Sequence, residues 1–306
     1  IGSFSADCVI NTLKRGGSKV VGCDIYPAEW HAVSKDCDRV YRAPLAVKEN
    51  DYIAFLLDVV SRERVGHIIP LTDLEIDVLN RHRDIFAGYS VCLCMPEKEV
   101  LSVARDKYNL FLAFRDDDAV PSISTYKTKI DDIPEDLLPC IGKPCNGRSS
   151  EGLRRVETLP ELRELKEKEN YVVQEMLTGP VITVDYVRNS FTGNDFCIPR
   201  EELLRTKNGA GTTVRVFHSE ELEFIVKHIG RKLNINGCVN MEFIFHEEKY
   251  YLMDINPRFS AGVAFSWIAG YDMVTSHVNC FLDLDILSPV EYREQIVAKR
   301  YREEVL

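Results

Sequence analysis

Short apolar runs alternate with amphipathic segments over the first hundred residues. Helices are predicted at 6–15, 51–62 and 74–84, and strands at 19–24, 67–70 and 89–94. Gly16 and Gly17 directly follow the first helix, where glycine commonly ends a helix. Regular alternation of short apolar strands with helices predicts a parallel sheet with helices on both faces.

The remainder of the chain mixes helical and strand periodicity differently. A helix over 97–114 is expected to lead into a small α+β unit, and a third block at 181–256 is richer in strands. The elements predicted beyond residue 114 are strands at 122–126, 138–143 and 171–176, helices at 158–168 and 219–233, and a mostly helical end, 270–306, with a strand-like tail. The fold class is therefore α/β followed by α+β.

Two of the later strands form a predicted hairpin. Residues 239–245 read VNMEFIF, residues 250–256 read YYLMDIN, and a polar HEEK sequence joins them. A three-residue loop, Glu247 to Lys249, leaves the apolar sets of both strands against one core, whereas a one-residue slip sends one set to the other face. The cross-strand pairs expected from this loop are Ile244–Leu252, Glu242–Asp254 and Asn240–Asn256.

The facing carboxylates of Glu242 and Asp254 carry the first chemical hypothesis. Like charges directly opposite each other repel, so the pair either shares a proton or holds a cation. Carboxylate oxygens with an amide beside them are ligands that suit Mg²⁺. A solvated polar face on an exposed hairpin is the alternative, and the hairpin alone does not decide between them.

Two further segments are candidates for binding. Residues 142–152 (GKPCNGRSSEG) follow a short apolar strand, and small, flexible residues there let backbone N–H groups approach phosphates, with Lys143 as a point charge. The segment is neither a Walker A loop nor GxGxxG, and an ordinary surface loop is the alternative. Residues 171–177 (YVVQEML) are a short apolar strand ending in a polar pair, which suits either a flat base or a protein core.

Composition narrows the class of protein. The 306 residues suggest two domains, and the net charge of −10 gives no basic footprint for nucleic acid. No apolar run approaches the roughly 18 residues of a membrane-spanning helix, and the start does not resemble a signal peptide. Ten cysteines without a CxxC predict reduced, buried thiols in a cytoplasmic protein. Because a glycine turn, Ile1 to Ser5, directly precedes a helix, we expect a first strand to be missing from this sequence.

The order of these motifs resembles the ATP-grasp superfamily. The sequence runs from Asp106-Lys107 through Lys143-Pro144 and Gln174 to Leu177, and ends with Glu242 and the DINPR motif at 254–258. It is most similar to short carbamoyl-phosphate-synthase-large-subunit-like proteins with a single ATP-grasp unit. The resemblance implies a Rossmann-like preATP-grasp domain at 1–97, with 69–73 (IPLTD) at a strand end. It also implies an ATP-grasp domain at 98–306, with a lid subdomain at about 120–178.

The resemblance also implies residue roles. Lys107 and Lys143 match basic residues that hold ATP phosphates, Glu175 to Leu177 match the adenine hinge, and Arg258 matches the arginine beside the transferring phosphoryl group. The nucleotide-binding set is Lys107, Lys143, Asn146, Gly147, Ser149, Ser150, Gly152, Gln174, Glu175, Met176 and Leu177. The magnesium ligands are Glu242, Asp254 and Asn256, and the catalytic set is Arg258, Lys143 and Lys207. Alternatively, Lys107 is a solvated helix lysine and Arg258 pairs with a nearby carboxylate.

The implied activity is an ATP- and Mg²⁺-dependent ligase that joins a carboxylate to an amine, or a thiol, through an acylphosphate. Two Mg²⁺ ions are expected, with Mn²⁺ as a substitute, and small molecules as the partners, with no nucleic acid or membrane. A homodimer is the commonest assembly. The sequence departs from the family at Val181, where an acidic ribose ligand is usual, and in the glycine-poor loop at 146–152. An ATP-binding module without turnover therefore stays open, and so, on the N-terminal alternation, does an NAD-dependent oxidoreductase.

Overall fold

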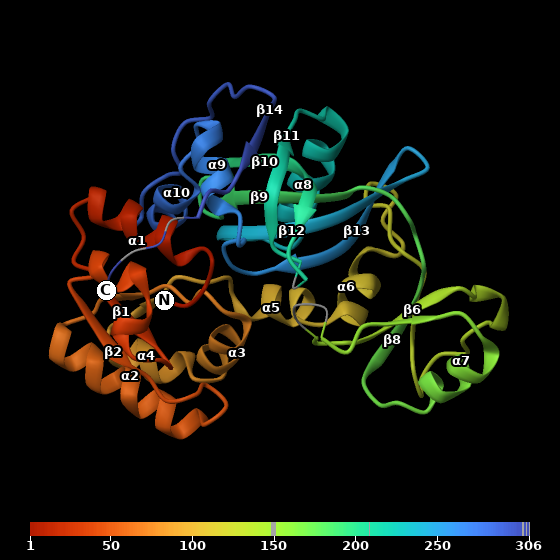
Figure 1. The fold of residues 1–306 in the computed structure, drawn as a ribbon, viewed down its shortest axis with the longest axis horizontal. Helices are drawn as coiled ribbons and strands as arrows, with labels where there is room; N and C mark the ends of the chain where they lie inside the picture. Colours follow the sequence, from red (N-terminus) through yellow and green to blue (C-terminus); the bar gives the residue numbers. More distant parts are fainter. Residues whose placement is uncertain (148–150, 208, 302, 304, 306) are drawn as a thin grey trace.

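Three groups of elements follow one another along the chain (Figure 1). The computed structural model describes residues 1–147, 151–207, 209–301, 303 and 305. The N-terminal lobe contains α1 (Ala6–Arg15), β1 (Val21–Asp24), β2 (Arg39–Arg42), α2 (Glu49–Glu63), β3 (His67–Ile68), α3 (Asp73–Arg81), α4 (Arg83–Gly88) and β4 (Cys92–Leu93). Strand β1 pairs with β2 and β3 pairs with β4, and both pairs are parallel as predicted. In the described residues they form two separate two-stranded sheets instead of the single sheet expected.

The helix predicted over 97–114 is wrong as a single element. The structure has α5 (Lys98–Ala104) and α6 (Lys107–Phe114) instead. The carboxylate of Asp106 accepts hydrogen bonds from the backbone N–H groups of Tyr108 and Asn109 and so caps a new helix. The backbone N–H of Lys107 donates to the carbonyl of Cys145, 2.8 Å away, which fixes the start of α6 against a later strand. This break places Lys107 at the first turn of a helix.

A four-stranded antiparallel sheet with one helix forms the second group. It comprises β5 (Thr125–Lys127), β6 (Cys140–Pro144), β7 (Arg154–Val156), α7 (Leu159–Lys166) and β8 (Tyr171–Glu175), in the order β5-β8-β6-β7. Its core, which includes Leu162, Leu165 and Val173, is separate from the other cores. Figure 1 shows this unit projecting from the rest of the molecule on the side away from the N-terminal lobe.

A six-stranded antiparallel sheet forms the third group, in the order β13-β12-β9-β10-β11-β14. Its elements are β9 (Val181–Arg188), β10 (Asp195–Arg205), β11 (Gly211–Val216), α8 (Glu220–Lys232), β12 (Gly237–His246), β13 (Lys249–Asn256), α9 (Val263–Ala269), α10 (Met273–Asn279) and β14 (Gln295–Ala298). One face packs against α8 and the other against α9 and α10. Gly230 lets helix α8 lie close to the sheet, since a Cβ at this position would stand 2.0 Å from the hydroxyl of Tyr186.

The prediction of a mostly helical end is wrong. After α10 the chain is irregular up to β14, which pairs with β11 as an edge strand. Asp283 has a φ of 57°, and Pro289 disfavours helical conformation at the residue before it, so the helix cannot continue. None of the helices in the described ranges has the length and apolar character needed to cross a membrane.

Candidate functional site

The turn between β12 and β13 has two residues instead of the three predicted. Glu247 and Glu248 have φ values of 44° and 61°, as the two central residues of a type I′ turn require. His246 therefore pairs with Lys249, and Ile244 pairs with Tyr251. Near the turn, the predicted register is wrong by one residue.

A β-bulge at Met253 restores the predicted register at the site. The pairing shifts between Phe243 and Glu242, so that Glu242 faces Asp254 and, further along, Asn240 faces Asn256. Without the extra residue, the two-residue turn would place Met253 opposite Glu242. The carboxylate pair was thus predicted correctly, but the bulge produces it.

The two carboxylates are held by an amide and two cations. The side-chain amide of Asn256 donates to Glu242 Oε1 at 3.1 Å. Lys107 Nζ donates to Asp254 Oδ2 at 2.9 Å, and Arg205 Nη2 lies 3.5 Å from Glu242 Oε2. Burial, together with the charge of Asp254, raises the pKa of Glu242 above its usual value. The two negative charges thus lie close together, with Lys107 and Arg205 as their counter-charges.

Lys143 on β6 brings a second ammonium group towards this pair. Burial, assisted by the charge of Lys107, lowers the pKa of Lys143 to about 8, while Asp254 and Glu242 oppose that shift. Lys107 also donates to the carbonyl of Gly147 at 3.3 Å. Lys107 is paired with Asp254, and the ammonium of Lys143 adds a further positive charge beside it, which suits an anion with several charges.

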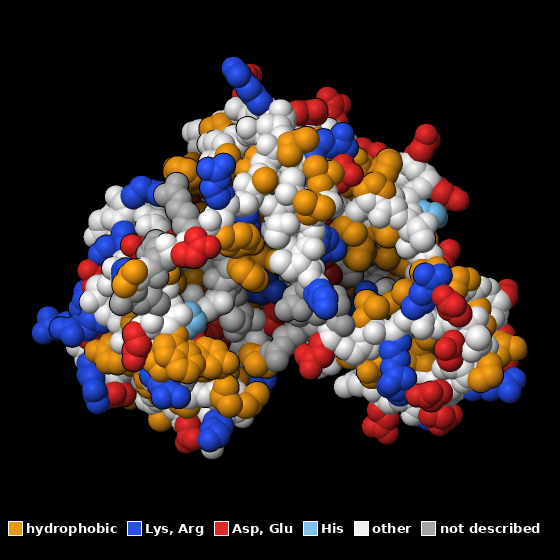
Figure 2. Space-filling model, viewed as in Figure 1, with side chains coloured by type: hydrophobic (Ala, Val, Ile, Leu, Met, Phe, Trp, Pro, Cys, Tyr) orange, Lys and Arg blue, Asp and Glu red, His pale blue; other side chains and the backbone are white. Residues whose placement is uncertain are grey.

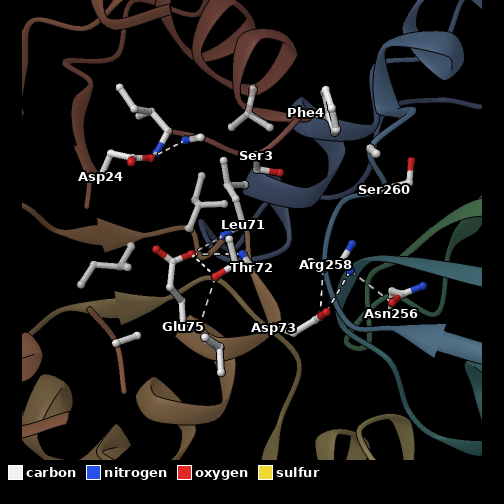
Figure 3. A pocket seen from close by; sticks show the side chains of 18 of the residues that line it. Ser3, Phe4, Asp24, Leu71, Thr72, Asp73, Glu75, Asn256, Arg258 and Ser260 are labelled. Atoms are coloured by element: carbon white, nitrogen blue, oxygen red, sulfur yellow. Dashed lines mark hydrogen bonds and ion pairs between the residues drawn. The ribbon is translucent and has the colours of Figure 1, made fainter. Parts of the chain in front are cut away.

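Arg258 is fixed by a residue of the N-terminal lobe. Its Nε and Nη2 donate to the two carboxylate oxygens of Asp73 at 2.9 and 3.0 Å, and Nη2 also donates to Asn256 Oδ1 at 3.2 Å (Figure 3). The alternative in which Arg258 pairs with a nearby carboxylate is therefore confirmed. The guanidinium group still lines the pocket described next.

One large pocket, of about 1120 Å³, joins these groups. It extends from the N-terminal lobe, at Ser3, Asp24 and Thr72, to Glu242 and Asp254 on the six-stranded sheet. Figure 2 shows the surface hollowed between the lobes, and Figure 3 shows residues of both lobes facing each other across the pocket. Of the predicted site residues, those that line it are Lys107, Lys143, Gly147, Glu242, Asp254, Asn256 and Arg258.

Comparisons with known families identify this arrangement. Residues 7–94 match the family described as "PylC-like, N-terminal domain". Residues 167–304 match the family described as "ATP-grasp in the biosynthetic pathway with Ter operon". The chain belongs to the ATP-grasp superfamily. The resemblance drawn from the DINPR motif and its order after Lys107 and Lys143 is thereby confirmed.

The individual relatives have low sequence identity to this chain. The carbamoyl phosphate synthase large chain of Thermoplasma volcanium is 26% identical over 288 residues, which cover 85% of this chain but 27% of that protein. Biotin carboxylase from Campylobacter jejuni has a TM-score of 0.78 at 16% identity, covering 94% of this chain and 70% of that one. The biotin carboxylase domain of Hydrogenobacter thermophilus 2-oxoglutarate carboxylase was solved with MgADP and bicarbonate. It has a TM-score of 0.76 at 17% identity, and the match covers 93% of this chain and 68% of that one. These likenesses confirm the predicted fold class, an α/β domain followed by an ATP-grasp domain.

The residues of the ATP-grasp domain fit a magnesium ion. Two carboxylates and an amide oxygen, from Glu242, Asp254 and Asn256, are hard oxygen ligands. The ammonium of Lys107 now supplies the positive charge beside Asp254. In the part of the chain that the structure describes, no group of three His, Cys, Asp or Glu side chains could hold a metal ion. A pair of carboxylates with one amide oxygen nevertheless suits Mg²⁺, which takes few protein carboxylates and completes its shell with phosphates and water.

Several other residues of the predicted ATP-grasp set lie away from the large pocket. Gln174 is buried and its amide donates to Thr125 Oγ1 at 2.7 Å, while Asn146 is exposed. Gly152 has a φ of 74°, and a Cβ there would stand 2.9 Å from Pro144. Those absent from the pocket lining are Asn146, Gly152, Gln174, Glu175, Met176, Leu177 and Lys207. Ser149 and Ser150 lie outside the described residues, and the roles of all these residues remain predictions.

Three residues of the ATP-grasp site were missed by sequence reasoning. Arg205, at the end of β10, contacts the carboxylate pair, whereas the predicted Lys207 does not line the pocket. Asp73 was noted only for its place after a strand, and its contact with Arg258 joins residues far apart in sequence. Glu202 lines the same pocket from β10. Such contacts between distant segments have no signature in residue spacing.

Proposed function

We propose that this chain is an ATP- and Mg²⁺-dependent ligase that joins a carboxylate to an amine, or less often a thiol, and releases ADP and phosphate. The observation that carries the proposal is the facing pair Glu242–Asp254 in one pocket with Lys107, Lys143 and Arg258. Because the chain spans about a quarter of its curated relatives, the activity is argued from this site and not from theirs.

The lysines serve the nucleotide phosphates. Lys107 and Lys143 neutralise phosphate oxygens, and phosphate binding draws Lys107 away from Asp254. Glu242, Asp254 and Asn256 would hold Mg²⁺, which would supply charge neutralisation at the phosphates. Asp254, once free of Lys107, would be available as a metal ligand.

Arg258 serves the transferring phosphoryl group. A carboxylate oxygen of the acid attacks the γ-phosphorus, the bond to the ADP oxygen breaks, and an acylphosphate forms. The amine nitrogen then attacks the acyl carbon and loses a proton, and the carbon–oxygen bond breaks to release phosphate. Arg258, held by Asp73 and Asn256 through Nε and Nη2, brings its positive charge and the remaining N–H of Nη1 to the charge that spreads over the phosphoryl oxygens.

The test is a screen for ADP release over a panel of carboxylic acids, with Mg·ATP and hydroxylamine. Hydroxylamine traps an acylphosphate as a hydroxamate, which forms a coloured complex with iron(III). ATP- and Mg²⁺-dependent hydroxamate formation with at least one acid is expected. ATP binding by calorimetry without ADP release for any acid would instead favour a binding module, and absence of ATP binding would refute the proposal.

A further inference from the structure

A buried group of charges lies on β9 and β10 beside the carboxylate pair, and the proposed reaction assigns it no role. Arg200 is 1% exposed, and its Nη1 donates to Asp185 Oδ2 at 2.7 Å. Its Nη2 donates to Ser260 Oγ at 2.9 Å, and Ser266 Oγ donates to the same oxygen of Asp185 at 2.7 Å. The charge of Arg200 is therefore already matched by the fully buried Asp185.

Glu202 extends from this group into the pocket. Its side chain is 4% exposed, and Oε1 lies 3.4 Å from Arg200 Nε. Its Oε2 is buried and has no hydrogen-bond partner among the described residues. Gly211 leaves the space for this oxygen, since a Cβ there would stand 1.9 Å from Oε2. A buried carboxylate oxygen without a donor is unfavourable, so this position suits a donor that arrives through the pocket.

The neighbouring groups indicate which donor fits. Asp185 and Glu202 are two carboxylates beside one guanidinium group, and Lys299, although close enough to act on Glu202 electrostatically, donates its hydrogen bond to the carbonyl of Ala261. Glu202 therefore shares the guanidinium group of Arg200 with Asp185, and its Oε2 is left without a donor among the described residues. An oxygen of a carboxylate that lacks a donor is best matched by a charged N–H donor, and the fitting ligand is therefore an ammonium group.

We propose that Glu202 binds the ammonium group of the amine substrate and so determines specificity for that substrate. The inference rests on the proposed ligase function. Glu202 lines the same pocket as Glu242, Asp254 and Arg258. An amine bound by Glu202 would therefore lie in the same pocket as the acid substrate. The pocket, at about 1120 Å³, has room for an organic primary amine beside the nucleotide and the acid, and that is the substrate class we assign.

The test compares Glu202→Gln with the wild type in two assays that share the acid found active in the screen. Hydroxylamine, largely uncharged at neutral pH, reports acylphosphate formation without an ammonium group, and a panel of organic primary amines and ammonium chloride reports use of the charged acceptor. We expect Glu202→Gln to raise the KM for the best amine by about tenfold or more, since a hydrogen bond to a charged group is lost. Hydroxamate formation and the KM for ATP should stay within about twofold of the wild type.

Glu201→Gln is the matched control, because Glu201 is the adjacent carboxylate and pairs with Arg215 instead of facing the pocket. It should leave both assays unchanged. An unchanged amine KM in Glu202→Gln would overturn the inference, and so would an equal fall in amide and hydroxamate formation, or ammonium chloride as the best acceptor. If no acid yields hydroxamate with any variant, the ligase function itself fails, and the role of Glu202 fails with it.

Discussion

Arg258 and Asp73 form a two-pronged ion pair between the six-stranded sheet and the N-terminal lobe, 185 residues apart in sequence. Burial favours the neutral form of Asp73, but Arg258, with Arg105 and Lys107, outweighs it and lowers the pKa of Asp73 below its usual value. Asp73 is therefore an ionised carboxylate that fixes the direction of the guanidinium group in the pocket. The N-terminal lobe thus contributes to the orientation of a predicted catalytic residue without supplying one itself.

Asp73→Asn should lower kcat for ADP formation about tenfold and leave the KM for ATP nearly unchanged. The amide keeps the shape of the side chain but loses one charge-assisted hydrogen bond, so Arg258 is less well oriented when charge develops on the phosphoryl group. Steady-state kinetics would separate the two parameters. Asp77→Asn is the control, since Asp77 pairs with Arg105 and does not contact Arg258; an equal loss in both variants would argue against orientation of Arg258.

Asp254→Asn should abolish most Mg²⁺-dependent turnover while the protein remains folded. Removing one of two facing carboxylates relieves their repulsion, so little stability is lost even though Lys107 loses its partner. The measurements are ADP release and the rise of Tm on addition of Mg·ATP, and both should be lost. Asp58→Asn, which removes the exposed partner of Arg62, should retain both. Wild-type ADP release from Asp254→Asn would contradict the metal role.

Lys143→Ala should raise the Kd for ATP about tenfold, because one ammonium group close to Lys107 and the carboxylate pair is removed. Lys143→Arg should recover part of the affinity by restoring the charge. Isothermal titration calorimetry checks both variants. Lys129→Ala is the control on the same lobe, because Lys129 is exposed and pairs with Glu167; equal affinities in the Lys143 and Lys129 variants would remove Lys143 from the nucleotide site.

His277 should make the protein less stable in mild acid. Its Nδ1 accepts the backbone N–H of Cys238 at 2.8 Å, so the proton is on Nε2, which lies 3.2 Å from the carbonyl of Cys94 in the N-terminal lobe. Burial lowers the pKa of His277 to about 4. The unfolded chain, with a pKa of about 6.5, binds more protons between these values. The free energy of unfolding therefore falls as the pH drops from about 6.5 to about 4, by up to about 3 kcal/mol.

Urea unfolding at pH 7 and pH 4.5 measures this loss. His277→Asn, which cannot titrate but keeps an acceptor for Cys238, should show a smaller loss between the two pH values than the wild type. His228→Asn is the control, because His228 lies on α8 with a partly exposed side chain and Nε2 2.9 Å from Asp117. The same pH dependence in the wild type and His277→Asn would show that His277 does not couple folding to protonation.

Hydrophobic periodicity predicted much of the fold. Strand β9 and helix α8 fall where the pattern predicted a strand-rich block with a helix, because burial of one face fixes the spacing of apolar residues whatever their partners. The misses have local causes. Asp106 caps a second helix inside an apolar run, and β2 has arginine at both ends and no apolar run long enough to be noticed.

The candidate site, like the fold, was predicted from the sequence only in part. Asp254, Asn256 and Glu242 lie on two sequence-adjacent strands, so alternation along each strand was enough to place them on one face. Even there, the turn length was wrong, and the bulge at Met253 compensated for it. Arg205, Asp73 and Glu202 come from three other segments, and no spacing rule connects them to the hairpin.

The sequence by itself determined the alternation of strands and helices in the first hundred residues, the family and the facing carboxylates, because these depend on short-range periodicity and on motifs within one strand or turn. Only the tertiary structure decided that Asp73 holds Arg258, that Arg205 contacts Glu242 and that Glu202 has an unpaired oxygen in the pocket. Such contacts arise when distant segments pack together. Their distances depend on how the whole core fills space, and a linear pattern of residues does not contain that information.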